Sequence, residues 1–102
     1  MRSAIPLLVQ SSLADLGQRI AVARKARGHS QAEFAALSDL GLSTVVGIEA
    51  GHTGVAVGNV AKALDALGLL GQLAAVAEVS QDPFVVEAGL ARLSSRRPGH
   101  GR

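Results

Sequence analysis

The chain has 102 residues, 48% of them hydrophobic and 2% aromatic, with a formal net charge of +2. This length suits one domain with a modest core, and the scarcity of aromatic residues favours closely packed helices over an aromatic-lined ligand pocket. The absence of cysteine excludes a disulfide framework and a thiolate zinc site and fits a reducing cytoplasm. No apolar run approaches the roughly 20 residues that span a bilayer, so we expect no membrane partner.

The first predicted helix runs from about Leu13 to Arg27. Ser12 and Asp15 have the spacing of a capping box, in which each side chain satisfies a backbone N–H of the first turn. Apolar residues then recur at helical spacing, at Leu16, Ile20 and Ala23. Gly28 ends the helix. Residues 1–11 are predicted to form an N-terminal arm.

The stretch from Ser30 to Gly51 predicts two short helices joined by a tight turn. Ser30 with Glu33 forms a second capping box, so the first of these helices begins at Ser30. The residues from Asp39 to Leu42 combine turn formers with apolar side chains that can fill the angle between the helices. The second helix runs from Ser43 to Ala50 and ends at Gly51, which readily adopts the left-handed conformation of a helix cap. This layout is that of a helix-turn-helix motif.

Two further helices are predicted before residue 80. The fourth begins at about Val57 and ends at Gly68, and the fifth runs from Leu69 to Val79. The sequence therefore predicts a compact, all-α, five-helix domain over residues 12–80. Residues 81–102 are predicted to form a C-terminal extension, in which the last nine residues, from Ser94, contain no apolar side chain and should be disordered by themselves.

The segment from Leu16 to Leu69 resembles the XRE, or lambda-repressor-like, family of helix-turn-helix proteins. Gln31 and Glu49 stand 18 positions apart, as in the pattern of that family. The other matching residues are Gly17, Ile20, Ala23, Arg24, Ser30, Ala32, Glu33, Phe34, Ala35, Thr44, Val45, Ile48, Gly51, Ala63, Leu64, Ala66, Leu67 and Gly68. The resemblance implies double-stranded DNA as a partner, with the helix from Ser43 to Ala50 in the major groove.

A narrower resemblance is to the HipB-like antitoxins, which repress their own operon as dimers and pair with a HipA-like kinase toxin. It is carried by Gly54 to Gly58 and Ala63 to Leu70, and the segment from Ala91 to Arg97 is similar to the short basic end of that subgroup. This resemblance implies a homodimer and a HipA-like toxin as partners. The apolar residues Phe84 to Val86 would then be a piece of the core, an element exchanged across a dimer, or a toxin contact.

The resemblance places the base-contacting positions on short side chains. They are Gly41, Leu42, Ser43, Thr44, Val46 and Gly47. The residues that usually read bases, Arg, Lys, Asn and Gln, are absent between Ser38 and Glu49. Ser43 and Thr44 can hydrogen-bond to a phosphate or a base edge, and the apolar members can pack on thymine methyl groups. We therefore expect modest specificity, supplemented by DNA shape. Gly47 weakens the helix by about 1 kcal/mol relative to alanine.

Phosphate contacts are expected beside these positions. Gln31 lies at a helix N-terminus, where backbone N–H groups attract phosphate. Its side-chain amide can bind that phosphate and also support the helix from Ser43 to Ala50, which we call the reading helix. The basic residues Arg19, Arg24, Lys25 and Arg27 form either a phosphate-facing stripe or an ordinary solvated face, with Arg24 alternatively pairing with Glu49. The complete predicted DNA-binding set is Gln31, Leu42, Ser43, Thr44, Val46, Gly47, Arg27, Lys25, Ser30 and His52.

Catalysis is not expected. The sequence has no Ser/His/Asp arrangement, no phosphate-binding glycine loop and no metal-ligand cluster, and its three histidines lack ligand spacing. We therefore predict no catalytic residue, no metal and no cofactor. The alternative to a DNA-binding regulator is a protein-interaction module that keeps the helix-turn-helix fold and has weak or lost sequence-specific DNA binding.

Overall fold

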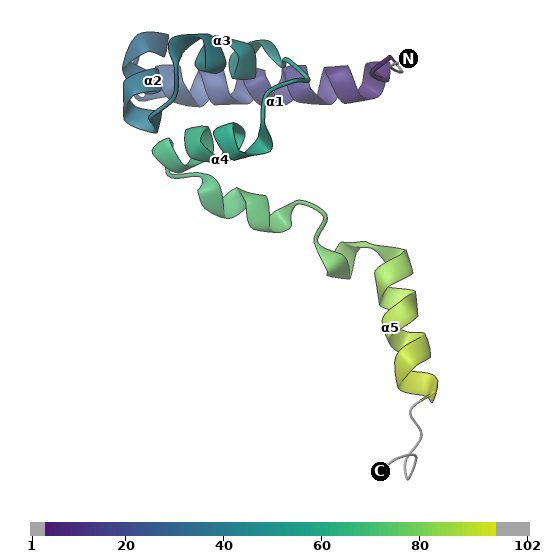
Figure 1. Ribbon diagram of the computed structural model, residues 1–102. Coiled ribbons are helices and arrows are strands. Elements are labelled where there is room, and N and C mark those ends of the chain that lie inside the picture. Colours follow the sequence, from purple (N-terminus) through teal and green to yellow (C-terminus); the bar gives the residue numbers. More distant parts are fainter. Residues whose placement is uncertain (1–3, 96–102) are drawn as a thin grey trace. The chain divides into compact units, whose positions relative to one another are not determined.

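A computed structural model describes residues 4–95 of the chain (Figure 1). No strand occurs among these residues, which confirms the predicted all-α fold. The elements are α1 (Leu7–Ala26), α2 (Gln31–Ser38), α3 (Leu42–Ala50), α4 (Val57–Ala66), the 3-10 helices η1 (Leu70–Ala75) and η2 (Val79–Gln81), and α5 (Pro83–Ser95). The chain divides into an N-terminal unit, Met1–Gly71, and a C-terminal unit, Gln72–Arg102. This division precedes the expected domain end at residue 80.

Helix α1 begins earlier than the sequence predicted. It starts at Leu7, directly after Pro6, so the predicted start at Leu13 is wrong. Proline suits this position because its φ is already helical and the missing N–H would have no partner there. Ser12 lies inside the helix and donates its hydroxyl to the Leu8 carbonyl at 2.9 Å, so it does not cap the helix. Part of the predicted N-terminal arm is therefore helical.

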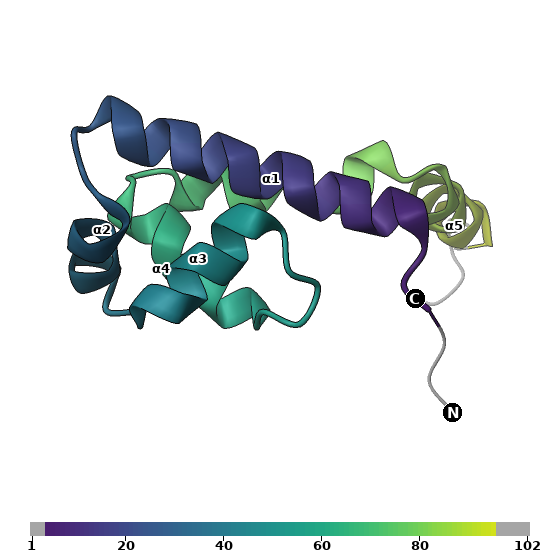
Figure 2. The same ribbon diagram turned by 90° about the horizontal axis from the view of Figure 1, so that it is seen from above.

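Four helices share one core in the N-terminal unit. Its buried members are Ile20, Phe34, Ala35, Val45, Ile48, Ala63, Leu64 and Leu67. Helix α1 lies across α3 at close range (Figure 2), and Gly17 permits this approach, because a Cβ there would lie 2.6 Å from the Glu49 carbonyl oxygen. The orientation of α3 thus depends on a site in α1 that has no side chain.

The region after Gly68 differs most from the prediction. The predicted helix from Leu69 to Val79 is wrong, because η1 and η2 replace it and Ala77, at φ 55°, interrupts the helical conformation between them. Phe84 is 81% exposed, so of the three alternatives for Phe84 to Val86 a piece of the core is not the one present. Residues 84–86 instead belong to α5, where the Asp82 carboxylate accepts a hydrogen bond from the Phe84 N–H at 2.9 Å. Ser94 and Ser95 end α5, and the rest of the predicted tail lies outside the described residues.

Candidate nucleic-acid interface

The helix-turn-helix begins with a complete capping box. The Glu33 N–H donates to the Ser30 hydroxyl at 3.1 Å, and the Ser30 N–H donates to the Glu33 carboxylate at 2.7 Å. Helix α2 ends at Asp39, whose left-handed φ of 55° turns the chain toward α3. Lys62 of α4 donates to the Asp39 carbonyl at 2.7 Å. The predicted capping box of Ser30 and Glu33 is confirmed. The turn between α2 and α3 is held in place by Lys62 of α4.

A buried ion pair holds the inner side of α3. Arg24 of α1 donates to both carboxylate oxygens of Glu49, through Nε at 2.7 Å and through a terminal nitrogen at 2.9 Å. Its other terminal nitrogen donates to the His29 carbonyl at 2.8 Å. Gln31 of α2 donates its side-chain amide to Glu49 at 3.0 Å. We call these three side chains, Arg24, Gln31 and Glu49, the clasp, because they join α1, α2 and α3.

The charges of the clasp stabilise each other. Burial by itself raises the pKa of Glu49, but hydrogen bonds from Arg24 and Gln31 and the charge of Arg24 lower that pKa below its ordinary value overall. The hydrogen bond to Glu49 raises the pKa of Arg24. Glu49 is therefore ionised at neutral pH and acts as a structural acceptor. Of the alternatives for Arg24, the pairing with Glu49 is the one present.

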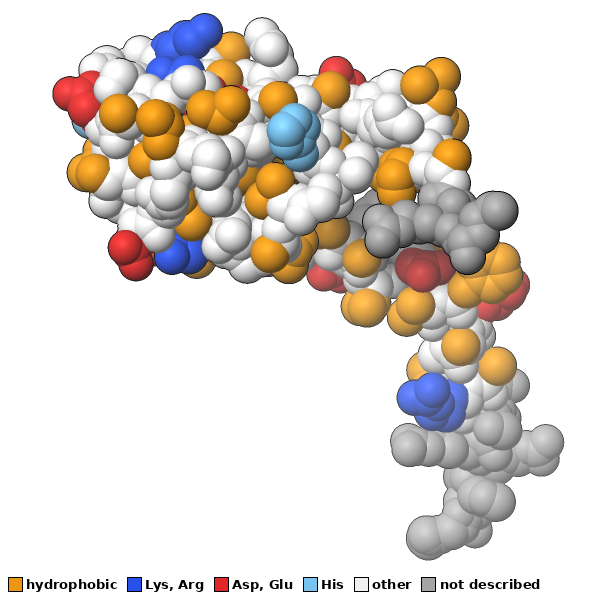
Figure 3. All heavy atoms as spheres, turned by 45° about the horizontal axis from the view of Figure 1, so that its top comes forward, with side chains coloured by type: hydrophobic (Ala, Val, Ile, Leu, Met, Phe, Trp, Pro, Cys, Tyr) orange, Lys and Arg blue, Asp and Glu red, His pale blue; other side chains and the backbone are white. Residues whose placement is uncertain are grey.

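The outer side of α3 carries the predicted base-contacting residues. Leu42 and Val46 are 51% and 42% exposed. Ser43 is exposed and Thr44 is half-buried, and neither hydroxyl has a hydrogen-bond partner among the described residues. Gly47 is buried against the next loop, where a Cβ would lie 3.3 Å from Nδ1 of His52. The face of the molecule seen in Figure 3 has few charged side chains over the N-terminal unit.

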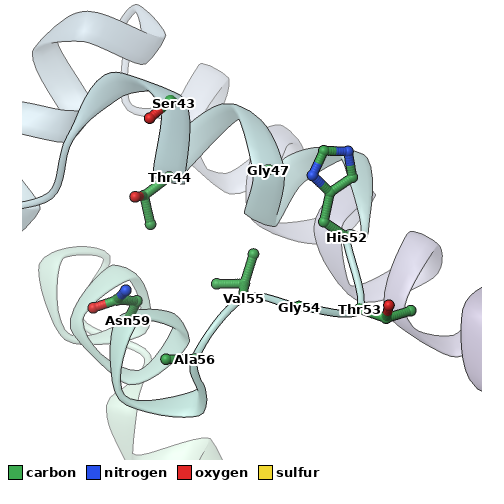
Figure 4. A pocket seen from close by; sticks show the side chains of 9 residues that line it. All are labelled: Ser43, Thr44, Gly47, His52, Thr53, Gly54, Val55, Ala56 and Asn59. Atoms are coloured by element: carbon green, nitrogen blue, oxygen red, sulfur yellow. The ribbon is translucent and has the colours of Figure 1, made fainter. Parts of the chain in front are cut away.

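An open groove of about 680 Å³ lies between α3, the following loop and the start of α4 (Figure 4). Residues from all three segments line it: Ser43, Thr44, Gly47, His52, Thr53, Gly54, Val55, Ala56 and Asn59. Four of the predicted DNA-binding residues, Ser43, Thr44, Gly47 and His52, are thus brought together. The sequence prediction missed Thr53 and Asn59, although a lone Asn in the first turn of the next helix is a signal that could have found the latter.

The other predicted residues lie away from this groove. Gln31 belongs to the clasp, and the Ser30 hydroxyl is engaged in the capping box. Arg27 donates to the Ala23 and Leu67 carbonyls, both at 2.8 Å, and so ties the end of α1 to the end of α4. Lys25 is exposed and is available to a phosphate. The four predicted basic residues therefore do not form one stripe, because Arg24 is only 6% exposed.

Two other kinds of feature are absent from the described part of the chain. Within residues 4–95, no three His, Asp or Glu side chains gather as a metal site. No helix in the same range is both long and apolar enough to cross a membrane. The groove beside α3 is lined by hydroxyl, amide and imidazole groups, which can hydrogen-bond to phosphate oxygens or to base edges.

These features define an all-α protein with a helix-turn-helix motif. The clasp holds one side of its second helix, α3, and the other side of α3 lines an open groove. A family model described as helix-turn-helix matches residues 20–71, about half of the chain. The chain therefore belongs to this helix-turn-helix family, of XRE type, and is a DNA-binding transcription regulator. Comparison with curated proteins and with solved structures gave no match.

Proposed function

We propose that this protein is a repressor that binds its own operator as a homodimer, with α3 in the major groove and Lys25 and Gln31 beside the phosphates. The observation that carries the proposal is the contrast between the clasp, which fixes α3 from inside, and the groove of unpaired polar side chains outside it. Two copies would place their reading helices in half-sites about 34 Å apart, one turn of the duplex.

The reading helix favours shape recognition. Ser43 and Thr44 offer short hydroxyls, and Gly47 offers no side chain, so bidentate contacts to guanine or adenine are out of reach for these positions. Short side chains let the backbone of α3 approach the floor of the groove closely. Discrimination then comes from sequence-dependent groove width and bending, supplemented by contacts from His52, Thr53 and Asn59.

Salt dependence tests the DNA contact. Binding to the DNA upstream of the protein's own gene should be tight and should weaken steeply as salt rises, because each neutralised phosphate releases counterions. Fluorescence anisotropy with that DNA and with a scrambled duplex of equal length measures both affinity and specificity. Equal, weak binding to the two duplexes at near-physiological salt would contradict operator binding.

We further propose that the repressor is an antitoxin that neutralises a HipA-like kinase toxin. The support is the similarity of the segments from Gly54 to Gly58 and from Ala63 to Leu70 to that subgroup. The toxin gene should then lie beside this one, and the purified toxin should form a complex with the full chain. Co-expression of the two proteins followed by size-exclusion chromatography provides the test, and separate elution would exclude this partner.

A protein-interaction module is the second candidate function. Its support is the apolar surface of α3 at Leu42 and Val46, which suits a protein at least as well as a base edge. In that case DNA affinity would be low at every salt concentration. The anisotropy experiment above distinguishes the two functions.

A further inference from the structure

A small apolar cavity of about 110 Å³ lies between α1, the end of α3, the loop after α3 and the start of α4. Its hydrophobic lining, which we call the apolar wall, consists of Leu13, Leu16, Ile48, Val55, Val57 and Val60. Ile48 is 5% exposed and Val57 is 82% exposed, so the cavity leads from the core of the N-terminal unit to the surface. No Asp, Glu, Lys or Arg is among the described residues that line it. This lining suits a neutral, apolar occupant.

The side chains around the cavity are too short to close it. Val55, Val57 and Val60 are β-branched, and their restricted χ1 rotation does not carry a methyl group across the space. Movement of α3 toward α1 does not close it either, because a Cβ at Gly51 would already lie 2.5 Å from the Cα of Ala14. Side chains that face empty space lose dispersion contacts on that side. An apolar occupant would restore these contacts.

The volume of the cavity limits the occupant to a small molecule. An engineered apolar cavity of about 150 Å³ stays dry and binds benzene or xenon. The present cavity, of about 110 Å³, is somewhat smaller. It therefore admits one six-membered ring or a short alkyl group, and it excludes a helix of a partner protein.

The cavity shares part of its lining with the proposed DNA interface. His52, Thr53 and Val55 line both the cavity and the groove beside α3 (Figure 4), and Ile48 belongs to α3 itself. An occupant packed against this loop restricts its motion, so that less conformational entropy is lost when DNA binds. Such coupling is reciprocal, since DNA and the occupant raise each other's affinity by the same factor.

We propose that this cavity binds a small, neutral, apolar molecule and that this ligand strengthens operator binding. The ligand site itself goes beyond the proposed function, and only the effect on the operator rests on it. The ligand is thus an effector of the repressor, with a site inside the helix-turn-helix unit and no contact to a charged side chain.

Methyl NMR of the full chain without DNA tests the site, with benzene as the probe. The Leu, Val and Ile methyl signals of the apolar wall should shift until benzene saturates the site, and these methyl groups should show nuclear Overhauser contacts to the benzene protons. The methyl signals of Leu7 and Val22, which are exposed on α1 and lie outside the cavity, should not shift.

Variants that fill the cavity test its position. Val60→Leu adds a methylene group to the lining and should weaken benzene binding about tenfold, a factor that the titration resolves. Val22→Leu is the matched control, the same substitution at an exposed site on α1, and it should leave benzene binding unchanged. Leu13→Phe fills the cavity from the side of α1 and gives an independent test if Val60→Leu does not fold. Circular dichroism of each variant checks the fold.

Three results would overturn the ligand site. They are methyl groups of the apolar wall that do not respond to benzene, an equal response at Leu7 and Val22, and folded Val60→Leu and Leu13→Phe variants that both bind benzene as the wild type does. Overhauser contacts between Val60 and a side chain of residues 72–95 in the free chain would also overturn it, because the chain itself would then fill the cavity.

Fluorescence anisotropy with operator DNA at saturating benzene tests the coupling. Operator affinity should rise about fivefold or more, the lower end of ordinary coupling between two sites. Unchanged affinity would contradict the coupling. If benzene occupied the cavity but the chain did not bind operator DNA at all, the proposed function and the coupling would fail together, and the ligand site would stand.

Discussion

One side of α3 is fixed by the buried carboxylate of Glu49, while the other side faces an open groove with Thr44 and Gly47 on its wall. The fixed side uses charge, burial and three hydrogen bonds to one carboxylate. The open side uses short side chains without partners. The contacts that stabilise α3 and the side chains proposed to contact DNA thus lie on opposite faces of a nine-residue helix, so substitutions on the two faces should affect different measurements.

The largest effect is expected from Glu49→Ala. It leaves the Arg24 guanidinium, 6% exposed, without its counter-charge, and the free energy of unfolding should fall by about 3–5 kcal/mol. Urea unfolding followed by circular dichroism measures the loss. Asp65→Ala, which removes an exposed carboxylate on α4, is the control and should change the stability by less than about 0.5 kcal/mol. If the free energy of unfolding fell equally in the two variants, Glu49 would contribute no more to stability than an ordinary surface carboxylate.

Acid should release part of the same stabilisation. The folded pKa of Glu49 lies below its ordinary value, so its contribution is complete above the unfolded pKa, about 4.3, and is lost as pH falls through the folded pKa. Glu33 contributes with the same sign, since the Ser30 N–H and then the Ser30 hydroxyl lower its pKa. Unfolding curves from pH 7 to pH 2 should show a smaller pH dependence in Glu49→Gln than in the wild type. Identical slopes would mean that Glu49 does not titrate differently on folding.

A smaller loss is expected where α1 meets α3. Gly17→Ala forces a Cβ against the Glu49 carbonyl, to which it would lie 2.6 Å, and overpacking of this kind costs about 1–3 kcal/mol. Gly58→Ala is the matched control in α4, where a Cβ meets nothing within 4 Å. It should be neutral or stabilise by up to about 1 kcal/mol. Equal melting temperatures for the two variants would mean that α1 can shift away from α3 at little cost.

The smallest change in stability is expected on the open side. Thr44→Ala should reduce operator affinity about tenfold, a loss within the usual range for one contact, while leaving thermal unfolding nearly unchanged. Gln31→Ala sharpens the comparison because Gln31 also donates to Glu49, so it should lower both affinity and melting temperature. Anisotropy and thermal denaturation on the same samples separate the two effects. A sharp fall in the melting temperature of Thr44→Ala would mean that Thr44 stabilises the fold, as the residues of the clasp do.

The sequence predicted best where the signals were local. The capping box of Ser30 and Glu33 and the left-handed end at Gly51 depend on residues a few positions apart, and both are present as expected. The pairing of Arg24 with Glu49 was open at the sequence level because it spans 25 positions. The start of α1 was missed because the pattern at Ser12 outweighed Pro6, which suits a helix start equally well.

The candidate site also contains residues that the sequence predicted and residues that only the tertiary structure brings to it. The family pattern gave Ser43, Thr44 and Gly47, which do line the groove, but it gave no reason to add Thr53 and Asn59 from the loop and α4. Arg27 has a basic side chain in a promising place, yet two backbone carbonyls engage it. Its partner Leu67 lies 40 positions away, and no local pattern contains that information.

The existence of α1 to α4, the turn chemistry and the family followed from the order of residues alone, because caps, turns and apolar periodicity act over one or two turns of chain. Only the packing of α1 to α4 decided which charges are structural and which polar groups remain without a partner. Burial makes that decision, since a charge removed from water must find its partner inside the fold. Arg24 and Glu49 did so across α1 and α3, and the unpaired side chains of Ser43, Thr44 and Asn59 remained on the surface.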